Sequence, residues 1–171
     1  MLIQSAQYFR NMNIPWNINL DTQDLLNPQL LPFLHELLEE YPNRQRISIE
    51  LTAHAALHYE QELTVFVERC AKFGIGVFID NVGATPVNMQ RLLTLPIRGI
   101  KLNGSLINKY VDDNAIHDFV DHLCDVANNH SVSIVAEHIE TQSTLSLLNQ
   151  LPIRYAQGYL FSHPNAAVST Q

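Results

Sequence analysis

The stretch 76–83 (GVFIDNVG) constrains the fold of this chain more than any other segment. Apolar residues of β-branched and aromatic type lead into an acidic residue, an amide and a glycine. This order is typical of a buried parallel strand that carries a carboxylate to its carboxyl end. The pattern recurs at 47–50 (ISIE), 97–103 (IRGIKLN) and 132–137 (VSIVAE). Strand after strand is therefore expected to present a polar group at its end.

Segments with helical periodicity separate these strands, and the connections between them are short. This repetition predicts a parallel sheet, either doubly wound or closed into a barrel, with functional residues at the carboxyl ends of the strands. No glycine-rich nucleotide-binding motif follows the first strand, so the sequence favours a TIM-barrel-like fold of the α/β class. Expected strands cover residues 16–20, 46–51, 75–80, 99–102, 131–137 and 155–160, and expected helices cover 1–13, 27–41, 55–73, 88–95, 108–129 and 141–151.

Charge and composition argue against several classes of function. The chain of 171 residues has a net charge of −7 and no cluster of Lys and Arg, so direct binding to DNA or RNA is not expected. It has no apolar run of about eighteen residues that would span a membrane, and no secretory signal pattern at its N-terminus. Cys70 and Cys124 lie in helical patterns and are expected to be reduced, which favours a cytoplasmic location.

Six segments carry motifs that are specific enough to suggest a family. They are 17–20 (NINL), 49–52 (IELT), 79–83 (IDNVG), 95–103 (LPIRGIKLN), 136–141 (AEHIET) and 157–164 (QGYLFSHP). In order, they resemble the V-N-L-S, E-x-T-E, D-D-F-G, L-P-(x)-K-I-D, A-E-G-V-E-T and Q-G-Y-x-F-S-x-P motifs of EAL domains. These are TIM-barrel cyclic-di-GMP phosphodiesterases and their non-catalytic relatives. The resemblance implies an EAL-like domain at residues 1–165, followed by a flexible tail at 166–171.

The resemblance also implies a chemistry and a set of site residues. In the family, two Mg²⁺ or Mn²⁺ ions held by oxygen ligands activate a water molecule and neutralise charge on the phosphate. Carried over motif by motif, the candidate metal ligands are Asn19, Glu50, Asp80 and Glu137, the remnant catalytic residues are Lys101 and Glu140, and the candidate ligand-binding residues are Gln157, Asn81 and Asn103.

The chain departs from the family pattern at five places. It begins after the Glu-x-Leu strand that names the family and supplies a metal ligand. Asn81 stands where the second aspartate of the pair is expected, Asn103 replaces the aspartate after the lysine, and Ala53 replaces the glutamate that closes E-x-T-E. The loop 82–86 reads VGATP in place of a flexible aromatic and glycine-serine sequence. Because each lost ligand typically lowers metal affinity or rate by one to a few orders of magnitude, we predict that hydrolysis is lost.

The missing strands predict an incomplete barrel. A parallel barrel of eight strands does not close with six, and its open edges expose backbone donors and acceptors. The gap is filled if the chain is a fragment of a longer protein, if the N-terminal helix covers it, or if two copies cover each other. Self-association or a protein partner is therefore predicted.

The lead hypothesis is a degenerate EAL-like domain that acts as a regulatory binding module in bacterial cyclic-di-GMP signalling, through a protein partner or a homo-oligomer. Binding of cyclic-di-GMP without turnover, weak metal-dependent phosphodiesterase activity and a purely structural role are the alternatives. For the candidate metal ligands, two interpretations stay open. Either they hold at most one Mg²⁺ or Mn²⁺ ion, or they only hydrogen-bond one another across the barrel mouth.

Overall fold

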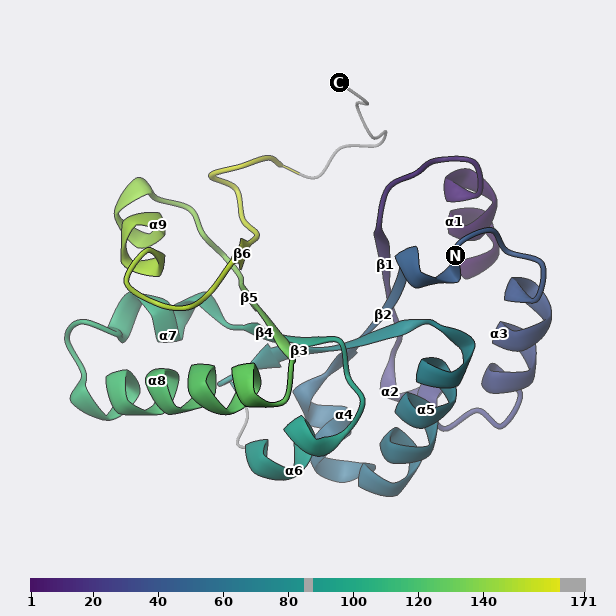
Figure 1. The fold of residues 1–171 in the computed structure, drawn as a ribbon, viewed down its shortest axis with the longest axis horizontal. Coiled ribbons are helices and arrows are strands. Elements are labelled where there is room, and N and C mark those ends of the chain that lie inside the picture. Colours follow the sequence, from purple (N-terminus) through teal and green to yellow (C-terminus); the bar gives the residue numbers. More distant parts are fainter. Residues whose placement is uncertain (85–87, 164–171) are drawn as a thin grey trace.

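The computed structural model describes residues 1–84 and 88–163 of the chain (Figure 1). Within this part, six parallel strands form one sheet in sequence order, and at least one helix lies between each strand and the next. Helical crossovers of this kind are what parallel strands require. The strands are β1 (Trp16–Asn19), β2 (Ile47–Thr52), β3 (Gly76–Val82), β4 (Gly99–Leu102), β5 (Ser133–Ala136) and β6 (Tyr155–Ala156).

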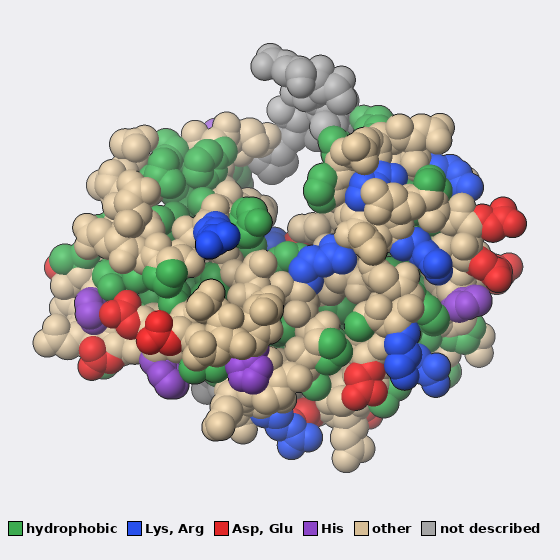
Figure 2. All heavy atoms as spheres, viewed as in Figure 1, with side chains coloured by type: hydrophobic (Ala, Val, Ile, Leu, Met, Phe, Trp, Pro, Cys, Tyr) green, Lys and Arg blue, Asp and Glu red, His purple; other side chains and the backbone are tan. Residues whose placement is uncertain are grey.

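The helices form an arc outside the strands, and β1 and β6 lie at the two ends of this arc (Figure 1). The surface is hollowed between the two ends (Figure 2). The helices are α1 (Leu2–Phe9), α2 (Thr22–Leu25), α3 (Leu30–Leu38), α4 (Ala53–His58), α5 (Glu60–Phe73), α6 (Met89–Thr94), α7 (Gly104–Lys109), α8 (Asn114–Asn129) and α9 (Gln142–Leu148), and a short 3-10 helix (Arg44–Arg46) precedes β2.

The two faces of the sheet differ in chemistry because side chains alternate along each strand. On the face that the helices cover, Ile49 and Ile100 are fully buried. The next residues along these strands, Glu50 and Lys101, belong to the opposite, inner face of the arc. The apolar core therefore lies between sheet and helices, and the inner face carries the polar groups.

The predicted fold class is confirmed. The six strands form a TIM-barrel-like but incomplete barrel, in which β1 and β6 occupy the two ends of the sheet and do not pair with each other. The domain boundary at residue 165 stays a prediction, and the predicted tail at 166–171 lies outside the described residues. The predicted stiff loop at 82–86 also falls partly outside them, at residues 85 and 86.

Two long predicted helices are each divided in the structure. The one predicted at 55–73 is α4 followed by α5, because Tyr59, with φ −132°, leaves the helical conformation between them. The one predicted at 108–129 is wrong at its start. Asp113 caps α8 by accepting the N–H groups of Ala115 and Ile116, and residues 104–109 form the separate helix α7. Apolar spacing continued across both breaks, so periodicity did not reveal them.

The last strand is shorter than predicted. Only Tyr155 and Ala156 pair with β5, although the prediction extended to residue 160. Gly158 follows at once, and its Cα lies so close to the backbone of Ile139 that a Cβ would collide with it. The backbone stays beside the segment that follows β5, because the Ile139 N–H donates to Gln157 and the Leu160 N–H donates to Ile139, but the regular strand pairing ends at Ala156.

Both cysteines are free and buried, as the sequence predicted for reduced core thiols. Burial raises the pKa of the Cys70 thiol to about 12. Burial and two neighbouring aspartates raise the pKa of Cys124 to about 11. Neither thiol is therefore ionised near neutral pH. In the described ranges, no helix combines the length and the hydropathy that crossing a bilayer demands.

Two glycines provide a test of the packing. A Cβ at Gly99 would contact the Phe78 ring and lie 2.7 Å from the Ser133 carbonyl oxygen of β5, which is fixed in the sheet. We expect Gly99→Ala to lower the free energy of unfolding by about 1–3 kcal/mol through overpacking. At Gly74 a Cβ would make only an ordinary contact, 3.9 Å from a side-chain carbon of Gln45, but the φ is +79°, so Gly74→Ala should cost only about 1 kcal/mol of backbone strain. Urea denaturation measures both, and an equal or larger loss for Gly74→Ala would contradict the packing argument.

Candidate functional site

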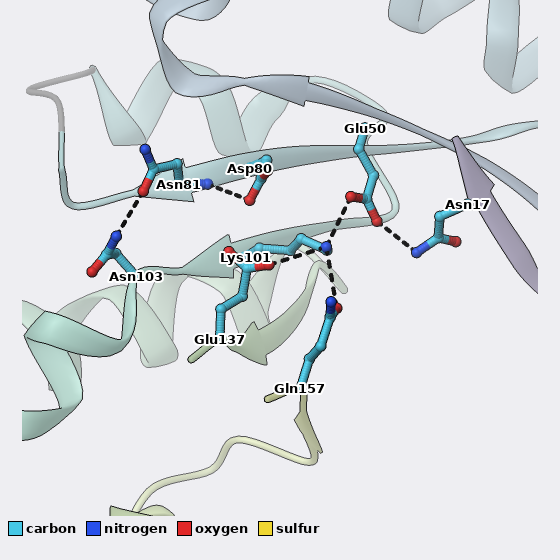
Figure 3. A network of polar contacts seen from close by, with 8 residues as sticks. All are labelled: Asn17, Glu50, Asp80, Asn81, Lys101, Asn103, Glu137 and Gln157. Carbon is cyan, nitrogen blue, oxygen red and sulfur yellow. Dashed lines mark hydrogen bonds and ion pairs between the residues drawn. The ribbon is translucent and has the colours of Figure 1, made fainter. Parts of the chain in front are cut away.

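Lys101 lies at the centre of a polar network on the inner face of the sheet (Figure 3). Its Nζ is 2.8 Å from Glu50 Oε2 and 3.1 Å from Glu137 Oε1, and it also donates to Gln157 Oε1 at 3.3 Å. The three charged residues are only 4–8% exposed. One ammonium group therefore binds two buried carboxylates and one amide at the same time.

Parallel strands explain how residues so far apart in sequence meet. Glu50 lies in β2 and Lys101 in β4, and Glu137 and Gln157 directly follow β5 and β6. The backbone continues the sheet beyond the last two strands, because the Glu137 N–H donates to Leu102 and the Gln157 N–H donates to Ala136. All four side chains thus lie at the edge of the sheet where the strands have their carboxyl ends, as the sequence predicted.

Burial and charge set the protonation of this cluster. Burial lowers the pKa of Lys101, but its hydrogen bonds and attraction to Glu50 and Glu137 outweigh this effect and raise the pKa overall. Burial is also the largest cause that raises the pKa of Glu137, to about 7, and Asp80 adds to the shift through a hydrogen bond and its charge. Lys101 is therefore firmly charged, whereas Glu137 titrates near neutral pH.

A bulge in β3 places the next two polar residues. Ile79 pairs with Ile100 and Val82 with Leu102, so Asp80 and Asn81 together occupy the space of one residue on β4. Asn81 has a φ of 60°, a left-handed conformation that asparagine tolerates better than most residues. The bulge directs Asp80 toward Glu137 and turns Asn81 toward β4 and Asn103 (Figure 3).

Asn81 and Asn103 form a neutral amide pair beside the charged cluster. Asn103 Nδ2 donates to Asn81 Oδ1 at 2.7 Å, and Asn103 Oδ1 accepts the Ser105 N–H at 2.9 Å as the N-cap of α7. An aspartate at position 103 would still cap the helix, but an ionised carboxylate has no hydrogen to donate, so Asn81 would have to turn its amide and become the donor. With asparagine at both positions, the hydrogen bond forms without any negative charge.

The structure brings most of the predicted site residues together. Glu50, Lys101, Glu137 and Gln157 form the central cluster, Asp80 lies beside Glu137, and Asn81 pairs with Asn103. Their roles as metal ligands, catalytic residues or ligand-binding residues stay predictions. Glu140 is exposed, and within the described part of the chain it makes no hydrogen bond to this network.

One site residue was missed. Asn17 Nδ2 donates to Glu50 Oε1 at 2.6 Å, whereas the predicted ligand Asn19 is the register partner of Glu50 and is exposed. Both amides lie on the same face of β1, because they are two residues apart in a strand whose burial alternates. That alternation was visible in the sequence and would have made Asn17 a candidate beside Asn19, without distinguishing the two.

The oxygen-rich site has the right chemistry for Mg²⁺ or Mn²⁺, but its arrangement does not fit a pair of ions. Lys101 already binds one oxygen of Glu50 and one of Glu137, and the amide pair supplies no negative charge. Among the described residues, no group of three or more Asp, Glu, His or Cys side chains is placed to hold a metal.

The fold and the site together define a barrel-derived α/β domain with a charged and amide-lined site at the carboxyl edge of its sheet. Comparison of the sequence with known protein families identifies this class. Residues 1–164 match the EAL domain, and the chain belongs to the EAL domain family.

Known relatives include cyclic-di-GMP phosphodiesterases. The chain is 30% identical over 150 residues to the probable cyclic di-GMP phosphodiesterase PdeA of Escherichia coli (strain K12), covering 87% of this chain and 21% of that protein. It is 28% identical to the cyclic di-GMP phosphodiesterase PdeA of Borreliella burgdorferi, covering 87% of this chain and 22% of that protein. The chain thus spans about a fifth of the length of these relatives.

Solved structures support the fold. The FimX EAL domain from Pseudomonas aeruginosa, bound to c-di-GMP, superposes with a TM-score of 0.86 at 20% identity, over 97% of this chain and 69% of that one. At this level of identity, the similarity establishes the fold alone.

The pKa of Glu137 predicts a pH dependence of stability. Because its folded pKa of about 7 exceeds the ordinary value of 4.5, the folded state binds the proton more tightly than the unfolded state. This contribution is fully present below about pH 4.5 and is lost as the pH rises through about 7, by an amount on the order of 1–3 kcal/mol. We expect Glu137→Gln to reduce the loss, as measured by urea denaturation in EDTA at about pH 5 and pH 8. An identical pH dependence of the two proteins would contradict the assignment.

Proposed function

We propose that this EAL domain has lost hydrolysis and acts as a regulatory binding module in cyclic-di-GMP-related bacterial signalling. Its relatives include proteins named as cyclic-di-GMP phosphodiesterases, which connects the family to this dinucleotide. In the proposed role, the domain controls a pathway through a protein partner or through self-association, within the cytoplasm. Binding of cyclic-di-GMP without turnover is the second arm of the same proposal.

The observation that carries the proposal is the hydrogen bond between Asn81 and Asn103. The family motifs place an aspartate at each of these positions, and two adjacent carboxylates repel each other unless cations lie between them. Two amides satisfy each other without any ion. Since this half of the site is electrically neutral and internally hydrogen-bonded, it gives a second divalent ion no charge to bind.

The neighbouring cluster supports the same conclusion. Lys101 places one positive charge between Glu50 and Glu137, so the chain itself offsets part of the negative charge at the barrel mouth. A single Mg²⁺ or Mn²⁺ ion would compete with the ammonium group for the same oxygens. Ala53 is the first residue of α4, directly after β2, and is only 1% exposed. Alanine stands here in place of the glutamate of the family motif, so that carboxylate is absent.

The first test measures hydrolysis directly. The protein is incubated with cyclic-di-GMP and Mn²⁺, and chromatography separates the linear dinucleotide from the substrate. We expect no more product than the Glu50→Ala variant gives, because the site lacks the charge to organise two ions. Turnover in the wild-type protein that Glu50→Ala abolishes would overturn the proposal.

The second test restores the missing charge. The double variant Asn81→Asp/Asn103→Asp replaces the amide pair with two carboxylates of nearly the same shape. We expect it to bind Mn²⁺ at least about tenfold more tightly than the wild-type protein in calorimetry, as is typical when a ligand position is restored. The control Asn11→Asp/Asn13→Asp adds the same charge at exposed positions between α1 and β1. Equal Mn²⁺ affinity in all three proteins would show that the amide pair does not limit metal binding.

A further inference from the structure

Two histidines lie on the same side of helix α4, outside the network around Lys101. His54 and His58 are four residues apart in this helix, and that spacing places two side chains one turn apart on one helix face. Both residues are exposed, and with the residues that the structure describes neither ring forms a hydrogen bond or an ion pair. A neutral imidazole keeps one nitrogen lone pair, so each ring offers solvent a free acceptor.

The separation of the two rings fits a single shared ion. Their centroids are 4.3 Å apart and their planes are inclined at 48°. A metal–nitrogen bond of about 2.0–2.1 Å places an ion about 3.2 Å from the centre of each ring, so two imidazoles on one ion have centres about 4.5–5 Å apart. Exposed side chains change their torsion angles readily, and a small rotation is sufficient to bring both nitrogens to the same ion.

The ligand type selects the class of ion. Imidazole nitrogen suits Zn²⁺, Ni²⁺ and Cu²⁺, whereas the oxygens of the barrel-mouth cluster suit Mg²⁺ and Mn²⁺. In the described part of the chain no third Asp, Glu, His or Cys joins the pair, so water molecules complete the coordination. The net charge of −7 favours the approach of a cation.

Helix α4 lies directly beside the candidate functional site. It begins at the end of β2, four residues before His54 stands Glu50, and it packs against β2 and β3. The residue before the helix, Thr52, is the register partner of Asp80. A helix of only six residues has little stability of its own. Since the two histidines span almost its whole length, an ion that binds both would stabilise this segment.

We propose that His54 and His58 together bind one late first-row transition ion, with Zn²⁺ and Ni²⁺ as the ions to test. The ion holds the second residue of α4 to its last one and so stabilises the segment that follows Glu50. This site uses nitrogen ligands and takes a different class of ion from the barrel-mouth cluster. Its occupancy does not depend on whether the domain hydrolyses cyclic-di-GMP.

Replacing the histidines with glutamine tests the site. Glutamine favours helix at least as well as histidine, so the variants should keep α4. In calorimetry at about pH 7.5, where an ordinary imidazole is mostly neutral, we expect His54→Gln/His58→Gln to weaken Ni²⁺ and Zn²⁺ binding at least about tenfold. Each single variant should lose nearly as much, because one ion needs both rings. Mg²⁺ binding should not change.

The matched control is His122→Gln/His130→Gln. These two histidines are also exposed, but they are eight positions apart, about 12 Å along a helix, which is too far for one ion. The control should bind Ni²⁺ and Zn²⁺ as the wild-type protein does. Equal affinity in the wild-type protein and His54→Gln/His58→Gln, or an equal loss in the control, would overturn the proposal.

Stability provides a second readout. In urea denaturation, Zn²⁺ should raise the midpoint of the wild-type protein and of the control, because an ion that binds only the folded state stabilises it. It should raise the midpoint of His54→Gln/His58→Gln much less, and in EDTA all three proteins should unfold at similar urea concentrations. A rise with Zn²⁺ that is as large in His54→Gln/His58→Gln as in the wild-type protein would contradict the assignment of the ion to α4.

Discussion

The contact of Lys101 with Glu50 and Glu137 is the interaction on which the inner face of the sheet depends. Two ionised carboxylates buried with no cation would destabilise the folded state, since removing one partner of a buried ion pair typically costs about 3–5 kcal/mol. The ammonium group of β4 lies between β2 and the end of β5 and meets this requirement from within the chain. It also fixes the relative positions of three strand ends, and Gln157 extends the contact to the fourth.

The site therefore consists of two halves that the chain's own groups hold together in different ways. In the charged half, Lys101 supplies the positive charge. In the neutral half, Asn81 and Asn103 replace charge with an amide hydrogen bond, and the same Asn103 side chain caps α7. A pair of divalent ions depends on an excess of negative charge at the strand ends, and both halves reduce that excess. The local hydrogen bonding and the proposed loss of hydrolysis thus follow from the same residues.

The sequence predicted the strand ends well because parallel strands bring their carboxyl ends to one edge whatever the details of packing. Glu50, Lys101 and Glu137 meet for this reason. The hydrogen bond from Asn17 was not predicted, because two amides on one strand face are equivalent in sequence and only their side-chain conformations distinguish them. The divided helices were also missed, because the breaks at Tyr59 and before α8 depend on backbone conformation and a cap rather than on apolar spacing.

The open edge and the site are linked through β1. Among the described residues this strand pairs with β2 on one side only, yet it contributes Asn17 to the hydrogen bonds of Glu50. An edge strand with partners on one side opens more readily than an interior strand, so the position of Asn17 is the least constrained part of the network.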